Sequence, residues 1–173
     1  ISFQFQNANT TDFTYTVKSI TVHSYTKGNL SLSKSGNPSN LMQTWGWPSP
    51  AVWSNPDSYE SVSFQTLPTA VTDDYTGNSK SNELFVLPQT FNTTGQNIQK
   101  VVIVVDETNN VNGITTRREF TKEFHEITDD HTAWEINKKI VYNITFNPTF
   151  NLEIYFDPAV AAWDTTTPGF EFN

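Results

Sequence analysis

Apolar side chains recur at every second position along much of this chain, and this alternation most constrains its fold. Near the start, Ile1, Phe3 and Phe5 alternate with polar residues. Successive side chains of a β-strand point to opposite faces, so the pattern indicates strands with one buried face. The same alternation recurs in three further segments: 13–17, 140–146 and 152–156. The sequence therefore predicts an all-β fold.

The alternation changes phase once near the start of the chain. Apolar side chains occupy odd positions up to Val17 and even positions from Ile20 onward. Such a change of parity would send every later side chain to the wrong face of the sheet. A β-bulge adds one residue to one strand and restores the register. We therefore predict a bulge near Lys18 and Ser19.

Other segments extend the strand prediction. The run 101–105 is entirely β-branched, which predicts a central strand followed by a polar loop. The run 84–87 is continuously apolar and ends at Pro88, which predicts a strand buried on both faces. Asn147-Pro148 separates two alternating segments and predicts a hairpin. The segment 117–127 fits either a helix or an irregular edge strand, and we favour the strand.

Two segments, 33–59 and 69–82, have the composition of long loops. The first contains Pro38, Pro48, Pro50 and Pro56, and the second is polar and acidic. Loops of this length are uncommon in compact domains unless they carry a function. Many short strands between turn signals favour a β-sandwich or a β-barrel. Of the two we predict the sandwich: a single domain over residues 1–173, a two-sheet antiparallel β-sandwich with long loops.

Composition excludes several classes of function. Hydrophobic residues make up 36% of the chain and aromatic residues 14%, which is too apolar for a disordered chain. The net charge of −8 disfavours binding to nucleic acid or to anionic lipid surfaces. The chain has no cysteine, and therefore no disulfide or thiolate site. No apolar stretch approaches about 18 residues, so we predict no direct insertion into a membrane.

No constellation of residues indicates an enzyme. The histidines are His23, His125 and His131, and no Gly-x-Ser-x-Gly elbow accompanies them. His23 is out of phase with the apolar positions of its segment, so we expect it to face solvent. A glycosidase would need two carboxylates across a cleft, and the sequence does not pair any. We predict no catalytic residue and no cofactor.

Two acidic segments were considered as metal sites. Asp129, Asp130 and His131 are adjacent in the sequence, as are Asp73 and Asp74. Calcium requires six to eight oxygen ligands at alternating loop positions, usually with a glycine at the turn. Neither segment provides them, so we interpret both as solvated loops and predict no metal ligand.

Three tryptophans form a candidate ligand-contact loop. Trp45, Trp47 and Trp53 lie within the proline-rich segment 33–59. Large apolar side chains exposed together mark contact sites, and aromatic rings of this kind stack on sugars. Alternatively, the three rings fold back and cover one end of the sandwich, where tryptophan provides a large buried area. The sequence leaves both interpretations open.

Three ordered segments carry a resemblance to a known family. The first is the apolar run that enters Pro-Gln at 84–90; the second spans 134–146, with Trp134-Glu135 followed by Lys138-Lys139 and Tyr142; the third spans 154–164. Together with the opening strand at 12–22, they resemble the fimbrillin-like pilin subunits (type V pilins) of Bacteroidetes over nearly the whole chain. The second segment departs from that pattern, because Asn137-Lys138 stands where the family often has Gly-Lys.

The resemblance implies a fold and a place in the cell. Fimbrillin-like subunits are secreted lipoproteins with two transthyretin-like β-sandwich domains, and this chain resembles the second of them. It begins at Ile1 without an initiator methionine, which agrees with a piece of a longer precursor. The location implied is extracellular, in a cell-surface fimbrium associated with the outer membrane. The chain would be a structural or accessory subunit whose partners are other fimbrial subunits.

The resemblance also implies assembly by strand exchange, in which a terminal strand of one subunit fills an open groove of the next. The candidate donor strand is Phe170, Glu171 and Phe172, although these residues also fit an ordinary last strand within the same domain. The alternative function is a tip adhesin or a carbohydrate-binding surface domain. In that case Trp45, Trp47 and Trp53 would contact host or bacterial surface glycans.

Overall fold

The computed structural model describes residues 1–30, 33–35, 44–46, 53–63, 69–72, 83–127, 131–135, 138–147 and 153–162. Within these ranges the backbone is almost entirely β, and the one helical element is the 3₁₀ turn η2 (Phe124–Glu126). The predicted all-β class is therefore confirmed.

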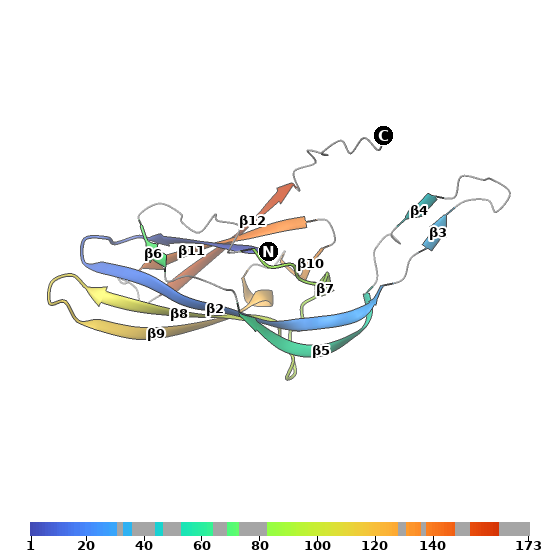
Figure 1. Ribbon diagram of the computed structural model, residues 1–173, viewed down its shortest axis with the longest axis horizontal. Coiled ribbons are helices and arrows are strands. Elements are labelled where there is room, and N and C mark those ends of the chain that lie inside the picture. The colour runs from blue at the N-terminus through green and yellow to red at the C-terminus, as the bar shows by residue number, and fades with distance from the viewer. Residues whose placement is uncertain are drawn as a thin grey trace, which may run out of the picture.

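The first main sheet contains three strands in the order β1-β11-β12 (Figure 1): β1 (Ser2–Asn7), β11 (Lys138–Asn147) and β12 (Glu153–Ala162). Strands β11 and β12 are antiparallel, which confirms the pairing predicted across Asn147-Pro148. Strand β1 pairs with β11 in the parallel sense, which is the one departure from antiparallel pairing among the described strands. Alternation along a strand specifies its buried face but not the direction of its neighbour, so the sequence pattern did not reveal this.

The second main sheet has the order β5-β2-β8-β9, with β6 also paired to β2. Its strands are β2 (Phe13–Leu30), β5 (Trp53–Ser63), β6 (Thr69–Val71), β8 (Lys100–Asn109) and β9 (Thr115–Glu123). The register between β2 and β8 shifts between Val17 and Ser19, which confirms the predicted bulge. The β-branched run 101–105 lies in β8, between β2 and β9, and is therefore central as predicted.

Two small sheets complete the described fold. Strand β7 (Gln89–Thr90) pairs with β10 (Ala133–Trp134), and β3 (Ser33–Ser35) pairs with β4 (Thr44–Gly46). Strands β3 and β4 lie beyond the end of the main sheets in Figure 1. The prediction that 33–59 is a loop was wrong for residues 33–35, 44–46 and 53–59, which lie in β3, β4 and β5; its other residues lie outside the described ones. Polar and proline-rich composition did not prevent these residues from pairing.

The predicted strand at 84–87 was also wrong. Glu83 forms a single bridge to Ser2, and Leu84 and Ile1 exchange backbone hydrogen bonds of 2.7 and 2.8 Å. The following residues belong to no strand, and Phe85 is 84% exposed. Leu84 and Val86 pack against the core from one side only. An extended segment with a single buried face therefore replaces the predicted strand.

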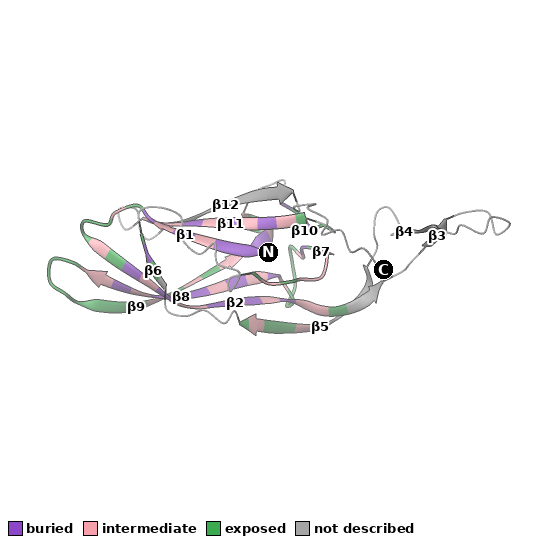
Figure 2. Cartoon of the chain, turned by 45° about the horizontal axis from the view of Figure 1, so that its top comes forward, coloured by how far each residue is buried: buried purple, intermediate pink, exposed green. Residues whose placement is uncertain are grey.

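The core lies between the two main sheets (Figure 2), and aromatic rings dominate it. The ring of Tyr15 in β2 stacks on Phe146 in β11, with centroids 4.9 Å apart. Phe120 of β9 also contacts Phe146, with centroids 6.0 Å apart. Within the first sheet, Phe3 stacks on Tyr142 at 5.2 Å. The contacts of Tyr15 and Phe120 with Phe146 join the two sheets into a sandwich-like arrangement, in which alternate residues of β1, β8 and β11 are buried.

Candidate functional site

The residues proposed from sequence as contact sites lie largely outside the described part of the structure. Trp45 lies in β4 opposite Lys34, and Trp53 begins β5 opposite Leu30. Their side chains, and all of Trp47, lie outside the described residues. The candidate donor strand of Phe170, Glu171 and Phe172 lies outside them as well. Both sets therefore remain predictions.

His23 lies on the face of β2 that points away from the core, as its phase predicted, but it is half-buried rather than exposed. The ring of Tyr59 on the neighbouring strand β5 covers it, with ring centroids 6.4 Å apart. Burial, with a smaller contribution from the nearby Lys100, lowers the pKa of His23. The imidazole therefore stays neutral at neutral pH, and it lies against a ring rather than beside a nucleophile.

His131 belongs to a buried polar group rather than to a solvated loop, which corrects the prediction for this residue. Its Nε2 lies 2.7 Å from the hydroxyl of Tyr142, and the indole Nε1 of Trp134 donates to the same hydroxyl at 2.7 Å. All three side chains are buried. The neighbouring residues of the proposed metal segment, Asp129 and Asp130, lie outside the described residues.

The hydrogen bonds of this group favour a neutral His131. An indole N–H only donates, so the Tyr142 oxygen accepts from Trp134 and directs its own proton to His131 Nε2. The imidazole is then neutral, with its proton on Nδ1. Burial lowers the pKa of His131 and raises the pKa of Tyr142, both in favour of the neutral forms. The arrangement is that of a satisfied structural network that links β10 to β11.

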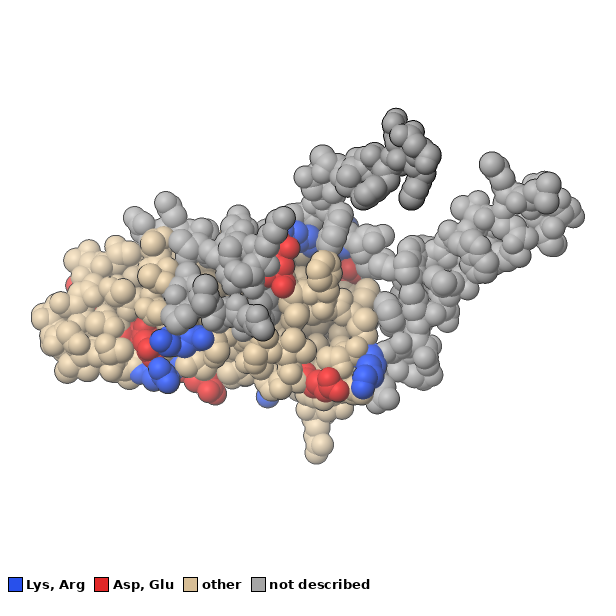
Figure 3. Space-filling model, viewed as in Figure 1, with Lys and Arg blue, Asp and Glu red and all other residues tan. Residues whose placement is uncertain are grey.

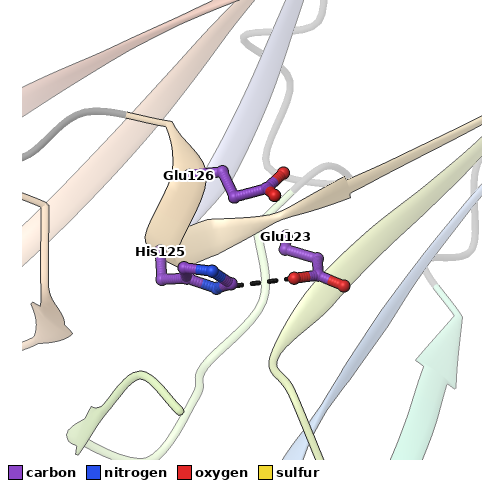
Figure 4. Close-up of side chains that lie close together, drawn as sticks. All are labelled: Glu123, His125 and Glu126. Atoms are coloured by element: carbon purple, nitrogen blue, oxygen red, sulfur yellow. Dashed lines mark ion pairs between the residues drawn. The ribbon is translucent and has the colours of Figure 1, made fainter. Parts of the chain in front are cut away.

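A second group of polar side chains lies where β9 ends. Glu123 is the last residue of β9, and the 3₁₀ turn η2 follows it at once. Side chains three residues apart lie above one another in a 3₁₀ turn, so Glu126 comes to the same side as Glu123. His125 lies between them in the sequence (Figure 4), and one ligand atom from each of the three residues lies within 4.8 Å of the other two.

Phe124 anchors this turn to the core. Its backbone N–H donates to the carbonyl of Gln99 at 3.0 Å, and its side chain is fully buried. The ring contacts Trp134 at 4.9 Å and Tyr142 at 5.1 Å between centroids. The turn is therefore fixed at its centre, and its polar side chains project from a rigid base.

Sequence reasoning missed this cluster. In a continuous strand, Glu123 and His125 would share a face and Glu126 would lie on the opposite one. The helical interpretation of 117–127, which we did not favour, would have brought Glu123 and Glu126 together. The observed segment is a strand up to Glu123 and a single 3₁₀ turn after it. The strand interpretation was therefore right for the first part of the segment, and the helical interpretation came closer for the last.

Strand β9 is an edge of its sheet, because no strand of the described chain pairs with its outer side. At the ends of the β8–β9 ladder, Phe124 N–H donates to Gln99 and Asn109 N–H donates to Ile114. In an antiparallel ladder these bonds recur at every second residue, so the even-numbered residues of β9 bond to β8. The odd-numbered residues, including Arg117, direct their N–H and C=O groups to the outer edge.

The side chains of β9 divide between the two faces of the sheet. The odd-numbered residues are exposed along most of the strand, and Arg117 Nε donates to the carboxylate of Asp106 at 2.9 Å. The even-numbered residues are partly buried, apart from Thr116, and Arg118 pairs at 3.0 Å with the buried Glu107. Figure 3 shows acidic and basic side chains beside one another on the face in view rather than grouped by sign.

Comparisons with known proteins assign no relative to the chain: no protein-family model, no curated protein and no solved structure matches it.

The part of the chain that the structure describes contains no helix long and apolar enough to cross a membrane.

Proposed function

We propose that the chain is a structural or accessory subunit of cell-surface fimbriae, located outside the cell in association with the outer membrane. It assembles by strand exchange with other fimbrial subunits, through addition of a neighbour's strand to an open sheet edge. The observation that supports this proposal is the outer edge of β9, with which no strand of the described residues pairs, in an all-β fold. The resemblance of the three ordered segments to fimbrillin-like subunits is the reason for proposing a fimbrium as the assembly.

An unpaired edge strand is a ready template for another chain. Its outward N–H and C=O groups form main-chain hydrogen bonds with an added strand, and alternate side chains then set the specificity. Strand β9 pairs with β8 in one continuous register from Thr108–Thr115 to Lys100–Glu123, so it contains no bulge that would disturb an added strand. The charged side chains of Arg117 and Glu119 keep this edge soluble before assembly.

The second of the resembling segments contributes residues to the core. Trp134, Tyr142 and Phe146 from the second segment are buried, and Trp134 donates to Tyr142. Residues 154–162 of the third segment lie in β12, beside β11. Buried residues of this kind specify a fold, which supports the structural role in this proposal.

The test uses native protein shed from cells and separated on SDS gels with and without boiling. A strand-exchanged polymer gives a ladder that collapses to monomer on boiling. A substitution of Glu119→Pro removes an N–H that faces the outer edge, where proline is tolerated, and so blocks strand addition. Glu119→Ala is the matched control, because it removes the charge and keeps the N–H.

We expect a ladder from the wild type and from Glu119→Ala, and monomer from Glu119→Pro, with the same circular dichroism for all three. A single monomer band for the wild type in both lanes would contradict assembly by strand exchange. A ladder that persists in a folded Glu119→Pro variant would exclude β9 as the edge that receives the strand.

A second candidate function is a tip adhesin or a carbohydrate-binding surface domain. The observation that favours it is the β3–β4 pair, which carries Trp45 and lies beyond the main sheets (Figure 1). The test is binding of the whole chain to an array of host and bacterial glycans. Replacement of Trp45, Trp47 or Trp53 by Ala should abolish binding, whereas Phe85→Ala, at an exposed aromatic residue elsewhere, should not. An array without any bound glycan would contradict this function.

A further inference from the structure

We propose that Glu123, His125 and Glu126 form a binding site for a zinc ion at the end of β9. The site would take one imidazole nitrogen and two carboxylate oxygens from the protein, with water in the remaining coordination position. This inference does not depend on the fimbrial function, because it rests only on the geometry where β9 passes into η2 (Figure 4).

The distances are those of ligands around one small ion. Two ligand atoms that each lie about 2.1 Å from zinc in a tetrahedral site are about 3.4 Å apart. The Nδ1 atom of His125 and the Oε2 atom of Glu123 are 3.6 Å apart. One ligand atom from each of the three residues lies within 4.8 Å of the other two, so a small movement of Glu126 completes the set. Glu126 is about half exposed, so its side chain has room for that movement once it leaves Lys122.

The imidazole supplies an independent observation. Its Nδ1 atom is shielded from solvent and has no hydrogen-bond partner in the structure. The 3.6 Å to Glu123 is too long for a hydrogen bond, although the two groups face one another. Buried polar atoms without a partner are rare in folded proteins and require an explanation. A cation bound between His125 Nδ1 and the Glu123 carboxylate would give both groups a partner.

The base of the site is rigid. Phe124, between Glu123 and His125 in the sequence, is fully buried and bonded through its N–H to Gln99. Ligands carried by a fixed backbone lose little conformational freedom on binding an ion, which favours affinity.

The donor set selects the class of ion. Imidazole nitrogen together with carboxylate oxygen suits zinc and neighbouring transition metals, and three protein ligands with a water are a common zinc arrangement. Calcium takes six to eight oxygen ligands, and magnesium requires nearly ideal octahedral oxygen geometry. A site with one nitrogen and two side-chain carboxylates therefore favours zinc over either.

Two lysines oppose binding, which gives the proposal a specific signature. Lys122 Nζ lies 3.2 Å from Glu126 Oε2, and Lys100 is opposite Glu123 in the strand register. An ammonium group that pairs with a ligand carboxylate competes with the metal for it. Removal of the Lys122 charge should therefore strengthen zinc binding, an effect that a purely structural role for Glu126 does not predict.

The experiment titrates the whole untagged chain with Co²⁺, read by its visible absorption, and then displaces the cobalt with Zn²⁺. We expect one ion per chain. His125→Ala and Glu126→Gln should each weaken binding by more than about tenfold, because even outer partners of metal ligands are worth about 10–100-fold. His23→Ala and Glu119→Gln, which alter the same residue types outside the cluster, should leave the affinity unchanged, and Lys122→Gln should increase it.

Circular dichroism of each variant checks the fold, and Glu126→Gln alters an exposed side chain that the fold tolerates. No binding to the wild-type chain would overturn the proposal. Equal affinities for the wild type and a folded Glu126→Gln variant would also overturn it, as would weaker binding to His23→Ala than to His125→Ala.

Discussion

The hydroxyl of Tyr142 should stabilise the fold far more than a single hydroxyl ordinarily does. The substitution Tyr142→Phe keeps the ring and its packing, and removes only the oxygen that Trp134 and His131 share. Both partners are buried, so neither gains a full set of hydrogen bonds to water when the hydroxyl is lost. The variant therefore measures the cost of leaving two polar groups without a partner in the core.

The magnitude follows from the number of groups affected. Each buried donor or acceptor left unsatisfied costs about 1–3 kcal/mol. The Trp134 N–H and the His131 nitrogen are both affected, and the slight exposure of His131 reduces its share. We expect the free energy of unfolding to fall by about 2–4 kcal/mol. That is a large fraction of the roughly 5–15 kcal/mol by which domains are ordinarily stable.

Urea denaturation followed by tryptophan fluorescence and by circular dichroism measures this change. The matched control is Tyr15→Phe, since the Tyr15 hydroxyl is also buried but falls short of hydrogen-bond geometry and interacts with the Glu107 carboxylate at longer range. Burial, and then the nearby Glu107, raises the pKa of Tyr15, so its hydroxyl stays protonated. Its removal should be neutral or slightly stabilising. Equal effects of the two substitutions, or a loss below about 0.5 kcal/mol for Tyr142→Phe, would refute the reasoning.

Three further predictions test the charge and packing arguments. Burial lowers the pKa of His131 in the folded chain, so below about pH 6.5 the unfolded chain binds more protons than the folded one. The free energy of unfolding therefore falls as the pH is lowered, by at most about 1.4 kcal/mol per pH unit for this histidine. Above about pH 6.5 the contribution of His131 is constant. His131→Gln should flatten the pH profile of urea midpoints between pH 5 and 7, and an unchanged slope would contradict the assignment. Phe124→Ala should lower the free energy of unfolding by about 3–5 kcal/mol in the same assay, because its ring is fully buried. The control Val111→Ser, at an exposed hairpin tip, should lower it by less than about 0.5 kcal/mol. Similar losses for the two variants would mean that Phe124 does not anchor the turn. Arg118→Ala should cost about 1–3 kcal/mol, because it leaves the buried Glu107 without its cation, and the adjacent Arg117→Ala, at an exposed pair, should cost clearly less. The reverse order would refute the burial argument.

The sequence predicted those features of the fold that are encoded within a single strand. Alternation located the buried residues of β1, β2 and β11, and the change of parity located the bulge at Val17–Ser19. It did not predict what depends on a partner strand. The parallel pairing of β1 with β11 and the absence of a strand at 84–87 are both set by neighbours that are distant in the sequence.

The candidate sites show the same division. The cluster of Glu123, His125 and Glu126 requires a turn immediately after β9, and neither a helical nor an extended pattern over 117–127 produces it. The buried role of His131 requires Trp134 and Tyr142 to converge from two strands. The tryptophan loop and the terminal tail, by contrast, were chosen from composition alone and remain predictions.

The chemistry of the β9 edge restricts what an incoming strand can be. One face of such a strand would lie beside the exposed row of Arg117 and Glu119, and the other beside Phe120, which packs on the core. A matching strand therefore alternates polar with apolar residues, because its inner side chains extend the core and its outer ones meet water and charge. The segment Phe170-Glu171-Phe172 has this alternation. Its two rings would lie on the Phe120 side and Glu171 on the side of Arg117, a pairing of opposite charges. Phe170→Ser should therefore weaken assembly more than Glu171→Gln, since the buried ring contributes more than an exposed charge pair.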